Sequence, residues 1–132
     1  MVDVKDLMCG NWLYNNMLGR SLQIVNIPQW LREEAYDPVP VTVDMLKRIG
    51  FEKYEDLPLE RNCYKYWDKE YRYKLDVYPD FCNSDRIFSI HIDNEYCETI
   101  GSGEFTYVHE LQNLVRVITG QKLPITKEML YE

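Results

Sequence analysis

Apolar residues recur at helical spacing near the C-terminal end of the chain. The intervals are three, four and three residues, and the positions are Val108, Leu111, Val115 and Ile118. Such spacing places the side chains on one face of an α-helix. Thr106 precedes the pattern as a candidate N-cap, and Gly120 follows it as a typical helix terminator. We therefore predict a helix over residues 107–119 that packs its wide apolar face across a sheet.

A shorter helix is predicted over residues 43–49. Thr42 can cap its first turn, and Asp44 lies where the helix dipole favours an acidic side chain. Three apolar residues form a stripe on one side: Met45, Leu46 and Ile49. Gly50 fits the position after the last turn, which often has a left-handed backbone conformation. Two turns are too few to be stable alone, so this helix must dock on the sheet.

Residues 62–100 have the alternating pattern of antiparallel strands. Apolar and charged residues alternate over 71–77, and residues 87–92 place apolar side chains on one side and polar ones on the other. A further strand is expected over 96–100. Proline, asparagine and aspartate between these runs are typical turn residues, so we predict a β-meander. The glycines of residues 101–103 are expected to interrupt the chain after it.

The N-terminal part of the chain predicts a smaller β element. Residues 7–27 alternate partly and contain asparagine and glycine turns, which indicates a β-hairpin or a small barrel-like element. Residues 28–41 contain three prolines and are expected to be mostly loop, with one short helical turn over 30–35. Together the elements predict a single α+β domain over residues 1–132, in which residues 1–53 are compatible with an N-terminal subdomain.

The composition is that of a small acidic domain. The chain has 132 residues, of which 45% are hydrophobic, and its formal net charge is −7. No apolar run approaches the about 20 residues that span a bilayer, so no membrane association is expected. The first residues lack the basic and apolar regions of a signal peptide, which favours a cytoplasmic location. The negative charge repels phosphate backbones, so nucleic acid is not expected as a partner, whereas a homo-oligomer stays open.

No pattern indicates catalysis, a metal or a cofactor. The four cysteines are Cys9, Cys63, Cys82 and Cys97. None belongs to a C-x-x-C pair, and the His109-Glu110 pair lacks the second histidine of a zinc-protease helix. We therefore predict no catalytic residue, no metal site and no cofactor. A hydrolase that uses His109 or a bound metal is a third hypothesis. A scattered zinc site has no paired spacing to support it; its ligands would be Cys82, Cys97, His91 and His109.

Three polar residues lie beside the apolar stripe of the long helix. His109, Gln112 and Asn113 are separated by three and four positions, so they share one helix face. One interpretation is structural, with these side chains hydrogen-bonded to the backbone of a neighbouring loop. The other is a small polar pocket that binds a small ligand or a nucleotide.

Aromatic residues are unusually frequent, with eleven tyrosines and three tryptophans in the chain. So many exceed what a small core can bury, and exposed tyrosine and tryptophan favour protein interfaces. Four residues are the candidates for such an interface: Trp30, Trp67, Tyr71 and Tyr73. A structural role in the core and an interface role are both open at this point.

Three blocks of sequence cover most of the chain: Gly10-Asn11-Trp12, the run over 42–53, and the run over 107–114 followed by Thr119-Gly120. In order and spacing they resemble a family of small uncharacterised proteins of Bacteroidales genomes, often in prophage or mobile-element neighbourhoods. The resemblance implies a cytosolic accessory protein of a phage or mobile element and supplies no activity. The leading hypothesis is a non-enzymatic protein that binds a host or phage protein through an aromatic surface. The alternative is a small-ligand or nucleotide-binding protein that sequesters a signal.

Overall fold

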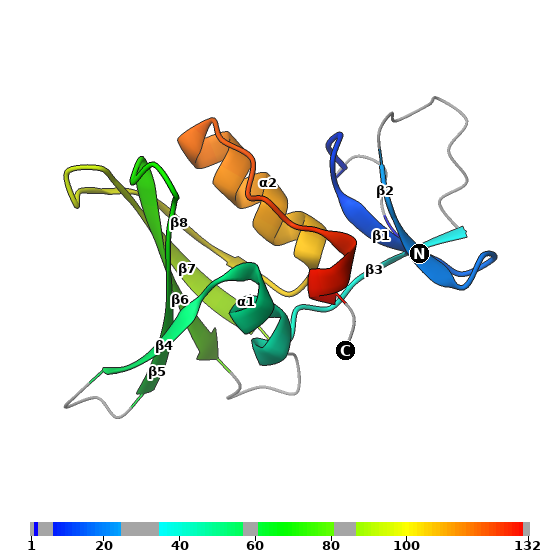
Figure 1. Cartoon of the computed structure of the whole chain (residues 1–132), viewed down its shortest axis with the longest axis horizontal. Coiled ribbons are helices and arrows are strands. Elements are labelled where there is room, and N and C mark those ends of the chain that lie inside the picture. Colours follow the sequence, from blue (N-terminus) through cyan, green and yellow to red (C-terminus); the bar gives the residue numbers. More distant parts are fainter. Residues whose placement is uncertain (1, 3–6, 25–34, 57–60, 81–86, 131–132) are drawn as a thin grey trace.

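The computed structural model describes residues 2, 7–24, 35–56, 61–80 and 87–130, and they form two antiparallel sheets and two α-helices (Figure 1). The smaller sheet contains β1 (Trp12–Asn15), β2 (Arg20–Gln23) and β3 (Tyr36–Pro38). The larger sheet contains β4 (Glu52–Asp56), β5 (Arg61–Trp67), β6 (Tyr73–Asp80), β7 (Ile87–Asn94) and β8 (Thr99–Phe105). The helices are α1 (Val43–Ile49), α2 (Val108–Thr119) and a short 3-10 helix, η3 (Lys127–Leu130). The predicted α+β class is therefore confirmed.

The larger sheet is a meander in which β4 to β8 pair in chain order. Both α-helices pack on the same face of this sheet, which we call the inner face, because their apolar side chains join its buried residues in one core. Leu75 and Ile90 of the sheet and Leu111 of α2 have no exposed surface. Helix α2 also contacts β1, so it lies between the two sheets (Figure 1). No helix in the described part of the chain is long and apolar enough to cross a membrane.

Both predicted helices form, and their ends follow from local hydrogen bonds. Helix α1 has the predicted bounds, with the Thr42 hydroxyl accepting from the backbone N–H of Met45 at 3.2 Å. The prediction of Thr106 as the cap of α2 is wrong, because the N-cap is Tyr107. The Glu110 carboxylate accepts from the N–H groups of both Thr106 and Tyr107, each at 3.0 Å. An acidic side chain in the first turn thus satisfies donors that a helix cannot satisfy itself.

The glycines expected to interrupt the chain lie inside β8 instead. Gly101 pairs with Ile92 and Gly103 with Ile90 in the adjacent strand β7. A Cβ atom on Gly101 would lie 2.6 Å from Cδ1 of Ile118, and one on Gly103 would lie 3.0 Å from Leu114. The missing side chains therefore allow α2 to lie close to the sheet, and the glycines do not form a turn.

The N-terminal part is an open three-stranded sheet; the predicted β-hairpin is formed by β1 and β2, whereas the described strands do not form the alternative barrel-like element. Strand β3 pairs with β1 in the proline-rich segment expected to be loop, and the predicted helical turn over 30–35 lies largely outside the described residues. The small sheet has its own cluster of buried residues, Val2, Leu7, Leu13 and Ile24. Val39, Val41 and α1 belong to the larger core instead, and so does Trp12 of β1, which joins the smaller sheet to that core.

Candidate functional site

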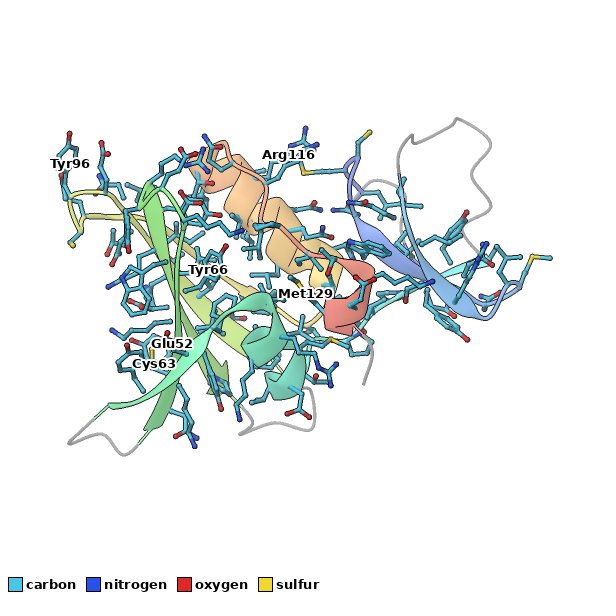
Figure 2. The ribbon with its side chains drawn as sticks, in the orientation of Figure 1. Glu52, Cys63, Tyr66, Tyr96, Arg116 and Met129 are labelled. Atoms are coloured by element: carbon cyan, nitrogen blue, oxygen red, sulfur yellow. The ribbon has the colours of Figure 1, made fainter. Side chains whose placement is uncertain are left out.

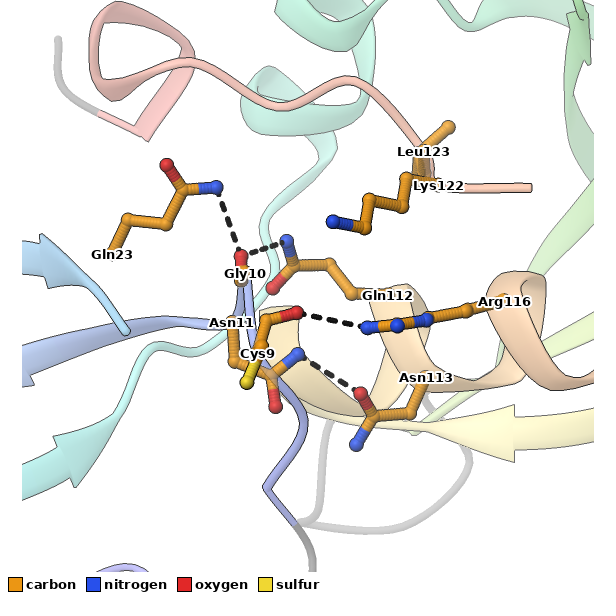
Figure 3. Close-up of a pocket in the computed structure, with 9 residues that line it drawn as sticks. All are labelled: Cys9, Gly10, Asn11, Gln23, Gln112, Asn113, Arg116, Lys122 and Leu123. Atoms are coloured by element: carbon orange, nitrogen blue, oxygen red, sulfur yellow. Dashed lines mark hydrogen bonds between the residues drawn. The ribbon is translucent and has the colours of Figure 1, made fainter. Parts of the chain in front are cut away.

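Two of the predicted ligand-binding residues hold the N-terminal segment against α2. The Gln112 amide accepts from the N–H of Trp12 at 3.0 Å and donates to the carbonyl of Gly10 at 2.9 Å (Figure 3). The Asn11 amide donates to Asn113 at 2.9 Å, and Arg116 donates to the Cys9 carbonyl at 3.0 Å. We call this set of contacts the polar seam.

The polar seam joins two of the three sequence blocks on which the resemblance is based. Residues 10–12 meet Gln112 and Asn113 of α2 directly. The indole N–H of Trp12 also donates to the carbonyl of Ile125 at 3.0 Å, which ties the segment after α2 to the same place. The polar residues of these two blocks therefore have a structural role, because backbone N–H and C=O groups that are removed from water need hydrogen-bond partners. This geometry favours the structural interpretation of Gln112 and Asn113.

The pocket beside the polar seam is small. It has a volume of about 40 Å³, and its lining includes Gln23, Arg116 and Lys122 (Figure 3). That volume holds a few water molecules, whereas pockets for drug-sized ligands have about 300–1,000 Å³. In this conformation the polar seam does not accommodate a nucleotide.

His109 lies in a different environment from Gln112. Its side chain is only 4% exposed, and its ring stacks on that of Tyr107 with the centroids 6.1 Å apart. It lines a second, open pocket of about 430 Å³, to which Glu104 and Val117 also contribute. Asn113 borders both pockets, but the three predicted residues do not converge on one site.

The predicted aromatic residues divide between surface and core. Trp67 is 40% and Tyr71 is 71% exposed, whereas Tyr73 is only 2% exposed and stacks on Tyr66 on the inner face. Burial raises the pKa of the Tyr73 hydroxyl. The assignment of Tyr73 to an interface is therefore wrong, because the strand register directs it into the core. Trp30 lies outside the described residues.

A group of aromatic residues lies on the opposite face of the larger sheet, which we call the outer face. Trp67 of β5 meets Tyr54 of β4 edge to face, with the ring centroids 6.0 Å apart. Lys65 places its ammonium group 5.6 Å from the centroid of the Tyr54 ring. We call Tyr54, Lys65 and Trp67 the aromatic patch. Tyr54 is not among the residues predicted from the sequence, because the run Glu-Lys-Tyr-Glu-Asp of β4 does not alternate between apolar and polar positions.

Beside the aromatic patch, the outer face carries paired charges on neighbouring strands. Lys74 lies 3.6 Å from Asp76 and 3.3 Å from Asp93, and Lys65 lies 3.8 Å from Asp76. The Thr99 hydroxyl donates to Asp93 at 3.0 Å. These lysines are engaged by carboxylates, so the face is not a basic surface of the kind that binds a phosphate backbone.

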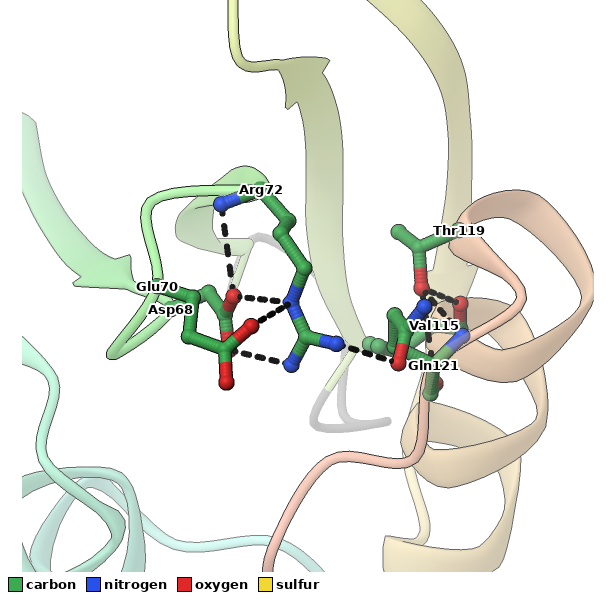
Figure 4. Close-up of polar contacts among 6 residues, drawn as sticks. All are labelled: Asp68, Glu70, Arg72, Val115, Thr119 and Gln121. Atoms are coloured by element: carbon green, nitrogen blue, oxygen red, sulfur yellow. Dashed lines mark hydrogen bonds and ion pairs between the residues drawn. The ribbon is translucent and has the colours of Figure 1, made fainter.

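The turn that follows Trp67 is fixed by one arginine. Arg72 donates to the Asp68 carboxylate, with Nε at 2.7 Å, and to the Gln121 side chain at 2.7 Å (Figure 4). The pairing connects the β5–β6 turn to the loop after α2. Tyr71 within this turn has a positive φ of 56°. These contacts fix the turn that directly follows Trp67 in the chain.

The Asp68–Arg72 pair predicts that stability falls at low pH. Hydrogen bonding to Arg72 lowers the pKa of the Asp68 carboxyl below its usual value of about 3.9. The stabilisation that the pair gives the folded state is therefore fully present at pH values above that usual pKa, and it is lost as the pH falls through the lowered pKa. Because the Arg72 side chain is 43% exposed, solvent screens the pair and we expect only a small effect on the free energy of unfolding. Urea unfolding at pH 7 and pH 3 should show a smaller pH-dependent loss for Asp68→Asn than for the wild type. An equal loss in both proteins would contradict the assignment.

The residues of the scattered zinc site are spread over the molecule. His91 is exposed on the outer face beside Tyr78, Cys97 lies on the β7–β8 turn, and Cys82 is outside the described residues. In the part of the chain that the structure covers, no three His, Cys, Asp or Glu side chains gather at metal-binding distance.

Comparison of the chain with protein families, curated proteins and solved structures gives no match in any of the three.

Proposed function

We propose that this protein is a non-enzymatic accessory protein of a phage or mobile element, which acts in the cytoplasm. Its role in this proposal is to bind a host or phage protein through the aromatic patch of Tyr54, Lys65 and Trp67. The observation that carries the proposal is the pair of large aromatic rings, 40% and 41% exposed, on an outer face that the helices leave open. The mobile-element origin rests on the sequence resemblance alone.

The composition of the outer face supports this role. Tryptophan and tyrosine are enriched among the residues that dominate binding energy at protein interfaces, and polar groups commonly surround them. Here Trp67 and Tyr54 are bordered by the paired charges of Lys74, Asp76 and Asp93. Rigid positioning also favours binding, because less side-chain freedom is lost. The Asp68–Arg72 contact supplies such rigidity next to Trp67.

The proposal predicts that Trp67→Ala weakens partner binding by at least about tenfold, since truncation of a central tryptophan commonly costs more than 1.4 kcal/mol. The partner is first captured from host lysate with the wild-type protein, and its affinity is then measured by calorimetry. Tyr96→Ala is the matched control, because Tyr96 is also aromatic, is 73% exposed and lies on the β7–β8 turn, outside the aromatic patch and two strands away from β5 (Figure 2). Equal losses in the two variants, or no loss in Trp67→Ala, would refute the aromatic patch as the binding surface.

A further inference from the structure

Among the described strands, β8 lies at one edge of the larger sheet. Within the described residues it pairs with β7 only, and its residues from Thr99 to Gly103 carry no charge. Natural proteins usually protect such edges with charges, prolines or bulges, because unpaired N–H and C=O groups accept a further strand. The opposite edge, β4, is rich in charge, with the sequence Glu-Lys-Tyr-Glu-Asp. The one irregularity in β8 lies near its start, opposite Ile92 and Asp93, and leaves the rest of the strand regular.

Helix α2 runs beside this edge and forms one wall of a groove. Ile118 lies over Gly101 and Leu114 over Gly103, so the helix follows β8 in the opposite direction. The open pocket of about 430 Å³ lies along this line, with Leu114 and Val117 of α2 and Glu104 of β8 in its lining. Val117 is 72% exposed although it is apolar. A helix beside a free strand edge is the arrangement in which extended peptides bind by strand addition.

The chain itself forms one isolated β-bridge just beyond β8. The N–H of Val41 donates to the carbonyl of Thr106 at 2.9 Å, and the N–H of Val108 donates to the carbonyl of Val39 at 2.8 Å. Pro40 and Tyr107 form the antiparallel bridge between these bonds. The backbone at this end of the strand is therefore already suited to antiparallel pairing.

We propose that the groove between β8 and α2 binds an extended peptide segment of a partner protein, in which basic and apolar residues alternate. Successive side chains of a strand point to opposite faces. Those on the helix side would contact Leu114 and Val117, and those on the other side would meet Glu104. The acidic side chains of Glu104 and Glu110 and the net charge of −7 select a basic segment. A second copy of the chain would place like charges at the same groove, which disfavours self-pairing.

This site is separate from the aromatic patch, because β8 and the β4–β5 pair lie at opposite edges of the sheet. The probe is a capped seven-residue peptide of alternating lysine and valine, matched to the seven residues of β8, and binding is measured by calorimetry on the full chain. We expect the lysine–valine peptide to bind at least about tenfold more tightly than a glutamate–valine peptide. Two further peptides carry methyl groups on alternate backbone nitrogens, one on the odd-numbered and one on the even-numbered residues. One of the two should bind at least about tenfold more weakly than the unmethylated peptide, because its methyl groups remove the N–H donors that pair with β8.

Glu104→Lys should weaken peptide binding at least about tenfold, and the neutral Glu104→Gln should weaken it less. Glu95→Lys is the matched control, since it makes the same charge change at an exposed residue of the β7–β8 turn and should leave affinity within about twofold. Trp67→Ala should also leave it unchanged, which separates this proposal from the aromatic patch. The proposal is overturned if the two methylated peptides bind equally well, or if Glu104→Lys and Glu95→Lys change the affinity equally. It is also overturned if the protein binds no peptide and instead forms a dimer that Glu104→Lys dissociates.

Discussion

Replacing Leu111 with alanine is expected to lower the free energy of unfolding by about 2–5 kcal/mol. Leu111 has no exposed surface and lies in the middle of α2, where it joins the core residues of the larger sheet. Truncation removes the buried methyl groups and leaves a cavity that a close-packed interior refills only in part. Total stabilities of domains are about 5–15 kcal/mol, so this single change removes a large share.

The measurement is guanidinium unfolding followed by circular dichroism, with Val117→Ala as the matched control. Val117 lies on the same helix and is 72% exposed, so its truncation should change stability by no more than about 0.5 kcal/mol. A loss below about 1 kcal/mol in Leu111→Ala would mean that α2 does not lie against the sheet in solution, and both proposed binding surfaces would lose their framework.

The sequence predicts those elements whose determinants are local. Helix α1 has its cap, its acidic first-turn residue and its terminal glycine within nine positions, from Thr42 to Gly50, and its bounds are confirmed. The apolar spacing of α2 and the alternation of β6 and β7 also act over short distances. The prediction of Thr106 as the cap of α2 is wrong because Glu110, inside the first turn, accepts from the N–H of Tyr107 and so supplies the capping hydrogen bond from within the helix.

The strand register and the contacts between distant segments could not be predicted in this way. Alternation alone does not say which parity faces the core, and Tyr73 faces it because Leu75, two residues on, pairs with Tyr66 of β5 on the inner face. Likewise the polarity of Gln112 fitted a ligand site and a structural contact equally well. Its hydrogen bonds to Gly10 and Trp12, about 100 positions away in the sequence, favour the structural contact.

The glycines of β8 show the same dependence on a distant partner and lead to a second large effect. Gly101→Ala is expected to lower the free energy of unfolding by about 1–3 kcal/mol, as is typical of overpacking. The added Cβ atom would lie 2.6 Å from Cδ1 of Ile118 and 2.8 Å from its Cγ2. Backbone strain makes no contribution, because Gly101 is not among the glycines with positive φ. Ser102→Ala is the control, since Ser102 is the exposed neighbour and should change stability by no more than about 0.5 kcal/mol.

A second substitution distinguishes crowding by α2 from any intrinsic need for glycine. Ile118→Ala removes all three of the atoms that the new Cβ would meet. In that background Gly101→Ala should be neutral or stabilising by up to about 1 kcal/mol, because alanine restricts the unfolded chain more than glycine does. The coupling between the two sites in a double-mutant cycle should therefore reach about 1–3 kcal/mol. If the two losses simply add, the glycines are not there to admit the helix, and the groove between β8 and α2 does not have the walls described above.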